Sequence, residues 1–192
     1  LQPMLADTRA DARARALIGE PGELSATYAG YIDRVLDAHA AAGARCILDI
    51  HNQARYRDFV FQPDGSVTGL VRADDPLLHA YTTDPSQVQE RIFATAPGAT
   101  LSVAAFADLW RRMALRWKDH PGLGGYGLMN EPHDLPRPGE TVASPADSQT
   151  EDLLIWPAYA RAAVDAIRAV DPQGPVYLGG NAWGGAMTLV PR

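Results

Sequence analysis

The strongest constraint on the fold of this chain is a unit of sequence that occurs three times. Each unit consists of an amphipathic helical stripe, a break, a short apolar run, and then polar or aromatic residues. Helices and short apolar strands that alternate along a chain are typical of α/β proteins with a parallel sheet. The repeated unit therefore predicts an α/β fold.

In the first unit the stripe ends before Gly43, residues 46–50 form the predicted strand, and His51 and Asn52 follow it. A glycine after the last periodic residue is a common helix stop. The members of the stripe recur at helical spacing and are Tyr28, Ile32, Val35, Leu36 and His39.

In the second unit the stripe consists of Phe106, Leu109, Trp110, Met113 and Trp117. We interpret these side chains as core packing rather than as a binding surface. Residues 120–122, His-Pro-Gly, stop the helix. Residues 125–129 form the predicted strand, and residues 130–133, Asn-Glu-Pro-His, follow it.

In the third unit the stripe consists of Ile155, Tyr159, Ala163, Ala166, Ile167 and Val170. Asp171 and Pro172 end the helix, because the residue before a proline is disfavoured in helical conformation. Residues 175–178 form the predicted strand, and residues 179–183, Gly-Gly-Asn-Ala-Trp, follow it.

All three predicted strands are followed by polar or aromatic side chains rather than by ordinary turn residues. In a parallel barrel the carboxyl ends of all strands open on one face, which is where catalytic residues lie. We therefore expect these three segments to share one mouth. Asp49 alternates with its strand neighbours and is expected to face the barrel interior or to bond an adjacent strand.

We treat residues 1–192 as part of one domain with two elaborated loops on the mouth side. The first covers residues 53–100, too long for a plain connection and rich in turn signals. The second covers residues 135–150.

A carboxyl group at the end of the second predicted strand points to glycoside hydrolysis. That reaction needs an acid to protonate the leaving oxygen and a second carboxylate on the other side of the anomeric carbon. Partial burial keeps such an acid protonated, and Glu131 follows an apolar strand that could supply it. Asn130 can hydrogen-bond a sugar hydroxyl, and Pro132 fixes the backbone where the strand ends.

Four motifs in one order make the resemblance specific. They are Leu48-Asp49-Ile50-His51-Asn52, Phe106-x-x-Leu109-Trp110, Gly127-Leu128-Met129-Asn130-Glu131-Pro132-His133 and Gly180-Asn181-x-Trp183. Together they resemble the cellulases of glycoside hydrolase family 5, of the endo-β-1,4-glucanase type, over residues 27–190. The resemblance implies a (β/α)8 TIM barrel, present here as a central fragment with about strands three to five.

The resemblance also implies roles for individual residues. Glu131 matches the catalytic acid/base, and the predicted substrate-binding residues are His51, Asn52, Asn130, His133, Asn181 and Trp183. His51 could instead cap its strand, and Trp183 could fold back onto a helix. Asn52, His133 and Asn181 could instead satisfy backbone groups of the loops. No cofactor and no metal is implied.

In the family the nucleophile is a second glutamate after the seventh strand, and no residue of this chain matches it. The other glutamates are expected in loops or at helix starts: Glu20, Glu23, Glu90, Glu140 and Glu151. We therefore expect a fragment of a longer protein, inactive alone and monomeric when complete.

Charge and composition bear on partners. With 17 Lys and Arg against 23 Asp and Glu, the formal net charge is −6, and no basic cluster is present. Nucleic acid and membrane partners are therefore not expected, nor is a membrane span, since no apolar run reaches about 18 residues. The single Cys46 is expected to be buried and inert. Secretion is inferred from a polysaccharide substrate.

Other functions stay open at this stage. A β-mannanase or a β-1,3-glucanase of the same fold would use the same two carboxylates. A catalytically inactive carbohydrate-binding barrel is a second class, although binding alone needs no protonatable Glu131. A dinucleotide-binding α/β fold is disfavoured because the glycines after residue 178 lack the required spacing.

Overall fold

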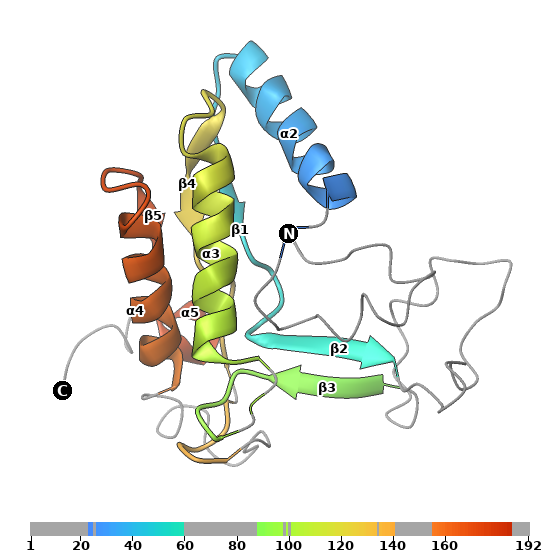
Figure 1. The fold of residues 1–192 in the computed structure, drawn as a ribbon, viewed down its shortest axis with the longest axis vertical. Coiled ribbons are helices and arrows are strands. Elements are labelled where there is room, and N and C mark those ends of the chain that lie inside the picture. The colour runs from blue at the N-terminus through green and yellow to red at the C-terminus, as the bar shows by residue number, and fades with distance from the viewer. Residues whose placement is uncertain are drawn as a thin grey trace, which may run out of the picture. The chain divides into compact units, whose positions relative to one another are not determined.

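Figure 1 shows the protein as a computed structural model, which describes residues 23–24, 26–59, 88–97, 99, 101–133, 135–140 and 155–185. The chain divides into two compact units. The larger contains Leu1–Ala54 and Ile92–Arg192, and the smaller is Arg55–Arg91.

The larger unit is built on a three-stranded parallel sheet with the order β1-β4-β5. Its strands are β1 (Cys46–Asp49), β4 (Leu123–Gly127) and β5 (Val176–Tyr177). Both pairings are parallel, as the repeated units predicted. All three carboxyl ends therefore point to the same edge of the sheet.

Three longer helices precede the strands, in the order that the repeated units predicted. They are α2 (Ala26–Ala41), α3 (Val103–Trp117) and α4 (Ile155–Arg168). A short fourth helix, α5 (Asn181–Gly184), follows β5. Among the described residues, no helix has the length and apolar character that a membrane crossing requires.

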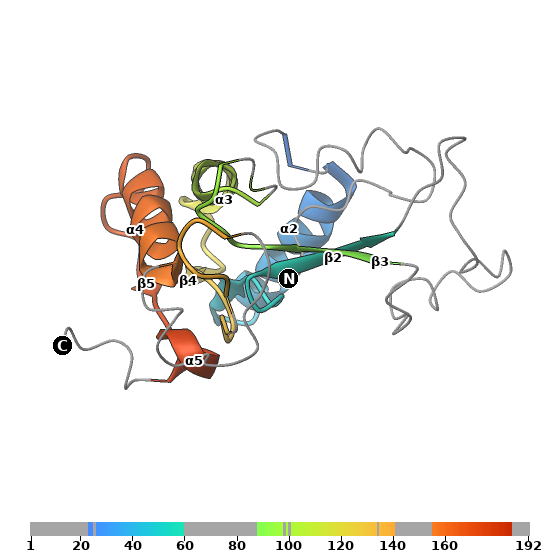
Figure 2. The ribbon, with the colours of Figure 1, turned by 90° about the horizontal axis from the view of Figure 1, so that it is seen from below.

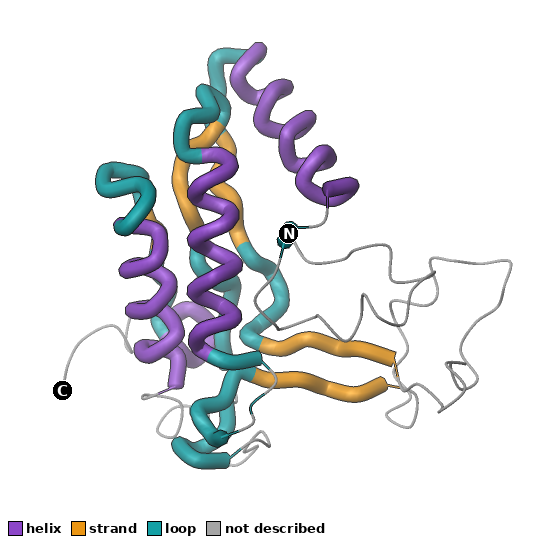
Figure 3. Tube along the Cα trace, in the orientation of Figure 1, coloured by secondary structure: helices purple, strands orange, loops and turns teal. Residues whose placement is uncertain are grey.

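Helices α3 and α4 pack along each other and cover the same side of the sheet (Figures 1 and 2). In Figure 3 the strands β1 and β4 run behind α3. Trp110 and Tyr126 are both fully buried and join α3 to β4, with ring centroids 6.0 Å apart. The stripe that was predicted to be core therefore is core, with Leu109 only half-buried.

Tyr159 of α4 holds the segment before α3 against the helix layer through ring stacking and hydrogen bonds. Its ring stacks on Phe93 at a centroid distance of 4.0 Å, and its hydroxyl accepts a hydrogen bond from the backbone N–H of Ala94. The hydroxyl proton has the carbonyl oxygens of Ala94 and Leu101 within reach. Burial raises the pKa of Tyr159 to about 12, so the hydroxyl stays a donor at neutral pH.

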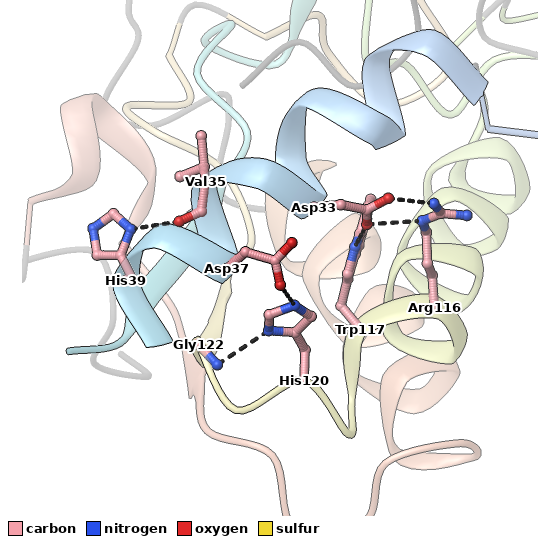
Figure 4. A network of polar contacts seen from close by, with 8 residues as sticks. All are labelled: Asp33, Val35, Asp37, His39, Arg116, Trp117, His120 and Gly122. Atoms are coloured by element: carbon pink, nitrogen blue, oxygen red, sulfur yellow. Dashed lines mark hydrogen bonds and ion pairs between the residues drawn. The ribbon is translucent and has the colours of Figure 1, made fainter. Parts of the chain in front are cut away.

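Polar contacts hold α2 to the end of α3 (Figure 4). Asp33 accepts hydrogen bonds from Arg116 Nη2 at 2.6 Å and from Trp117 Nε1 at 2.7 Å. The bond from Arg116 in particular holds the pKa of Asp33 below its usual value. His120 Nδ1 accepts from the Gly122 N–H at 3.1 Å, which leaves Nε2 as the donor toward Asp37 at 3.3 Å.

The face of the sheet opposite α3 and α4 carries different residues. Leu48, Tyr126 and Val176 are register neighbours on the helix side. Because side chains alternate along a strand, their neighbours Ile47 and Tyr177 lie on the other face. These two are 44% and 47% exposed. Within the described residues, this second face is therefore open.

The smaller unit departs from the prediction for residues 53–100. It contains the strand β2 (Arg55–Phe59) and all but the last residue of β3 (Val88–Ile92), and the two strands pair as a two-stranded sheet where an elaborated loop was predicted. Glu90 therefore lies in a strand and not in a loop. Strand pairing over a long sequence separation leaves no local pattern, and the abundant turn residues favoured a loop. Residues 60–87 of the predicted loop lie outside the described residues.

Smaller corrections concern β4, α2 and Cys46. Strand β4 begins and ends two residues before the predicted range 125–129. Val35, predicted in the buried stripe of α2, is exposed, and Cys46 is half-buried rather than buried. Of the second predicted loop, residues 135–140 form neither helix nor strand, and residues 141–150 lie outside the described part. Glu20 and Glu151 also lie outside the described part.

Two glycine substitutions are expected to change stability in opposite directions. At Gly122 an added Cβ would lie 2.0 Å from the carbonyl oxygen of Leu36, a backbone atom of α2 that cannot turn away. We expect Gly122→Ala to destabilise the protein by about 1–3 kcal/mol. At Gly30, inside α2, a Cβ meets nothing within 4 Å, and Gly30→Ala should stabilise it by about 0.5–1 kcal/mol.

Urea denaturation of the two variants and the wild type checks both signs. Equal stability of Gly122→Ala and wild type would contradict the close approach of α2 to the turn before β4. Gly30→Ala serves as the matched control, because the chemical change is the same.

Candidate functional site

The carboxyl end of β1 leads directly into two predicted site residues. His51 is exposed, and Asn52 is half-buried. The Nδ1 atom of His51 lies 3.8 Å from Oδ2 of Asp49, two residues earlier. The Oδ1 atom of Asn52 is buried and has no hydrogen-bond partner among the described residues.

A backbone hydrogen bond connects the segments that follow β1 and β4. The N–H of Asn130 donates to the carbonyl oxygen of Ile50 at 2.7 Å, one step beyond the paired strands. This bond places the side chain of Asn130 beside His51, with Nδ2 and Nε2 3.4 Å apart. The structure therefore brings together two residues that were predicted from separate motifs.

Glu131, the predicted acid, follows immediately. Its φ angle is +45°, in the left-handed region that residues other than glycine seldom adopt. The residue is exposed, so the prediction of partial burial is wrong for this structure. The prediction failed because the apolar sequence of β4 indicates burial of the strand itself and not of the residue that follows it.

His133 is buried against its neighbours and not open to solvent. It is 7% exposed, and its Nδ1 atom lies 2.8 Å from the carbonyl oxygen of Glu131. Its ring stacks on that of Trp183, with centroids 3.5 Å apart and planes 13° apart. This contact matches the alternative considered for His133, that it satisfies a backbone group of the loop.

Trp183 reaches the site from the carboxyl end of β5. Its backbone N–H donates to the carbonyl oxygen of Pro132 at 3.2 Å, and its side chain is exposed, at 56% for the residue. The indole lies on His133 and not on a helix, contrary to the alternative considered for it. Asn181, at the start of α5, is 2% exposed. Of the predicted residues, it is the least accessible.

Asp49 belongs to the site although it was not among the predicted site residues. It pairs in register with Gly127 of β4, where a Cβ would lie only 2.7 Å from its Oδ1 atom, so the missing side chain makes room for the carboxyl. Burial raises the pKa of Asp49, and His51 opposes this to a smaller extent. The spacing of two between Asp49 and His51 was the available signal, because it puts both on one face of a strand.

The arrangement therefore offers an exposed carboxyl group, a neighbouring amide and imidazole, and an exposed indole face. These groups can donate or accept protons and bind a ring with hydroxyl groups. Within the described ranges, no group of three or more His, Cys, Asp or Glu is placed to hold a metal ion.

Comparisons with known proteins identify a matching family and similar proteins. Residues 9–191 match the family described as Cellulase (glycosyl hydrolase family 5). Endoglucanase 1 of Robillarda sp. (strain Y-20) is 30% identical over 144 residues, covering 74% of this chain and 27% of that protein. Endoglycoceramidase of Cyanea nozakii is 27% identical over 192 residues, covering 84% of this chain and 37% of that protein.

A solved structure supports the same relationship. The endoglucanase Cel5A of Pseudomonas stutzeri in complex with cellobiose matches with a TM-score of 0.51 and 30% identity. The match covers 86% of this chain and 34% of that one. The chain thus spans between 27% and 37% of the lengths of these three relatives.

The raised pKa of Asp49 predicts that its charge costs stability. Well below pH 4, both the folded and the unfolded state carry the proton on Asp49. Because the pKa is higher in the folded state, the unfolded state loses this proton first as the pH rises. The resulting loss of folding stability is complete once the pH has passed the folded-state pKa. We expect Asp49→Asn to raise the melting temperature at pH 7, with a gain that shrinks as the pH falls toward 4.

Asp171→Asn is the matched control with the opposite sign. Burial raises the pKa of Asp171, but hydrogen bonds from Tyr126 and from the N–H groups of Gly174 and Gln173 outweigh it and lower the pKa. Its charge therefore stabilises the fold at neutral pH, and the variant should melt lower than wild type. Thermal melts from pH 4 to 8 compare the two. A lower melting temperature for Asp49→Asn at pH 7 would contradict the assignment.

Proposed function

Since the chain belongs to the cellulase family, glycosyl hydrolase family 5, we propose that the protein is a glycosidase that cleaves β-1,4-linked glucan chains. The observation that carries the proposal is the position of Glu131. It leaves the central strand of the sheet as an exposed residue, between the His51 and Asn130 pair on one side and Trp183 on the other. The names of the endoglucanase relatives support the choice of substrate.

The family's fold is the (β/α)8 barrel, and we propose that β1, β4 and β5 are its third, fourth and fifth strands. The open face of the sheet supports this. Ile47 and Tyr177 are nearly half exposed on the side away from the helices, where a barrel has its packed interior. Further strands of a longer protein would cover this face.

In the proposed reaction Glu131 acts first as an acid. A second carboxylate attacks the anomeric carbon while Glu131 gives its proton to the departing sugar oxygen, so that the glycosidic bond breaks and an ester forms. Glu131, now ionised, then takes a proton from water as the water oxygen displaces the carboxylate. The sugar is released with its original anomeric configuration, and both carboxyl groups return to their starting states.

The second carboxylate is proposed to come from outside these 192 residues. The chain spans only 27% to 37% of the lengths of the three relatives compared above. Apart from Glu131, no described glutamate follows a strand of the parallel sheet: Glu23 is paired with Arg112 at 2.7 Å, Glu90 lies within β3, and Glu140 lies in the loop that begins at residue 135. This chain alone is therefore proposed to be inactive.

Neighbouring residues are proposed to bind the sugar that the acid acts on. Asn130 and His51 present their amide and imidazole nitrogen atoms 3.4 Å apart, within reach of one hydroxyl group. Asn52, half-buried directly after His51, is proposed to bind a second hydroxyl through its side-chain amide. Trp183 can stack its exposed face on a pyranose ring. No cofactor takes part in this proposal.

The proposed location rests on the substrate. A polymeric glucan cannot enter a cell, so we propose that the protein is secreted. We also propose that the complete protein is a monomer. Mannan and β-1,3-glucan are hydrolysed by the same two-carboxylate chemistry. Substrate choice therefore depends on residues that contact sugars further from the scissile bond.

Glu131→Gln in the full-length protein tests the catalytic assignment. Glutamine keeps the size of the side chain but cannot deliver a proton, so we expect hydrolysis of soluble β-1,4-glucan to fall by about 10²- to 10⁴-fold. Reducing-sugar release measures the rate. Glu140→Gln is the matched control, because Glu140 is also exposed but is not among the residues brought together at the strand ends, and it should keep wild-type activity.

The same assay tests the substrate. Wild-type protein should release sugar faster from β-1,4-glucan than from mannan, laminarin or a glycosylceramide. Preference for one of the other three would replace the cellulase assignment. Binding of cello-oligosaccharides with no hydrolysis by wild-type protein would instead support a non-catalytic barrel.

A further inference from the structure

The backbone at Glu131 adopts a conformation that needs support from outside the residue. A φ of +45° is disfavoured for any side chain with a Cβ atom, and such outliers persist where surrounding contacts hold them. The direction of the Glu131 side chain depends on this backbone angle. Whatever maintains the angle therefore controls where the proposed acid points.

One support is a hydrogen bond from His133. Its Nδ1 atom lies 2.8 Å from the carbonyl oxygen of Glu131, and a carbonyl oxygen can only accept, so Nδ1 carries the proton. The bond spans Pro132, whose own φ is restricted by its ring. Together these two features close a tight loop that begins at the acid.

A second support keeps the His133 ring in place. The ring lies against the indole of Trp183 with centroids 3.5 Å apart, and the residue is only 7% exposed. Trp183 is itself anchored, because its N–H donates to the Pro132 carbonyl oxygen at 3.2 Å. The segment after β5 thus contacts the segment after β4 twice, once through the backbone and once through stacked rings.

We propose that His133 and Trp183 form a clamp that holds the backbone of Glu131 in its left-handed conformation and so aims the acid. His133 is then a positioning residue: its burial leaves little surface for a sugar, and it acts through Glu131. One face of Trp183 belongs to the clamp, and only its other face is free for a sugar. This inference rests on the proposed function of Glu131.

Two variants of His133 separate the parts of the clamp. His133→Phe keeps an aromatic ring against Trp183 but removes the N–H donor. His133→Asn loses the ring but keeps a donor, because the Nδ2 atom of asparagine is attached to Cγ as Nδ1 is in histidine. Trp183→Ala removes the stacked ring and keeps the backbone bond to Pro132.

Leaving-group dependence is a readout that general damage to the fold would not mimic. Cleavage of a cello-oligosaccharide, whose leaving group is a sugar hydroxyl, needs the acid, whereas 2,4-dinitrophenolate departs from a 2,4-dinitrophenyl β-cellobioside without protonation. For the full-length protein, kcat/KM is measured on the dinitrophenyl substrate and on a cello-oligosaccharide.

We expect His133→Phe to lower kcat/KM on the cello-oligosaccharide by about 10- to 100-fold, as misplacement of a catalytic group does. The dinitrophenyl substrate should change by less than about threefold, because its reaction does not use the acid. His133→Asn should recover much of the loss. Trp183→Ala should lower kcat on the cello-oligosaccharide as well as raise KM, because loss of the clamp slows the chemical step whereas loss of sugar stacking alone raises only KM. This split keeps the test decisive if His133→Phe does not fold.

Equal losses on both substrates for His133→Phe, or no loss, would overturn the clamp. A change confined to KM in Trp183→Ala would likewise reduce Trp183 to a sugar platform. Glu131→Gln distinguishes the two proposals. If it shows the leaving-group dependence and the His133 variants do not, only the clamp is wrong; if it leaves both rates unchanged, the proposed function fails with it.

Discussion

Parallel strand pairing that continues past the strand ends is the interaction on which the site depends. The strands β1, β4 and β5 align their carboxyl ends, and two further backbone bonds extend the alignment into the loops. Asn130 bonds Ile50 on one side, and Trp183 bonds Pro132 on the other. These bonds are made by backbone groups. They therefore bring three segments from distant parts of the sequence together around Glu131 independently of the identity of their side chains.

The helix layer supports this edge from one face only. Trp110 and Tyr126 pack α3 onto the central strand, and Trp156 of α4 donates to the carbonyl oxygen of Gly179, just before the segment that carries Trp183. The other face is open in the described residues, as Ile47 and Tyr177 show. The site is thus built at the boundary between a packed helix layer and a sheet face suited to further strands.

Much of this was available from the sequence, and what was not has a physical reason. Helical stripes and apolar runs report local burial, so they located α3, α4 and the three strand ends that meet at Glu131. They could not report pairing between β2 and β3, which is non-local, nor the exposure of Glu131, which depends on a left-handed backbone angle. The stacking of His133 on Trp183 joins two motifs whose order was predicted but whose contact was not.

The most direct test of the account is chemical rescue of the acid/base. In the full-length protein with Glu131→Ala, azide should restore turnover of 2,4-dinitrophenyl β-cellobioside, because azide attacks the glycosyl intermediate without needing a base. The product should be β-cellobiosyl azide, identified by NMR, which requires Glu131 on the side of the leaving group and a separate nucleophile. An α-cellobiosyl azide would place Glu131 in the role of nucleophile, and full activity of the variant without azide would remove it from the reaction.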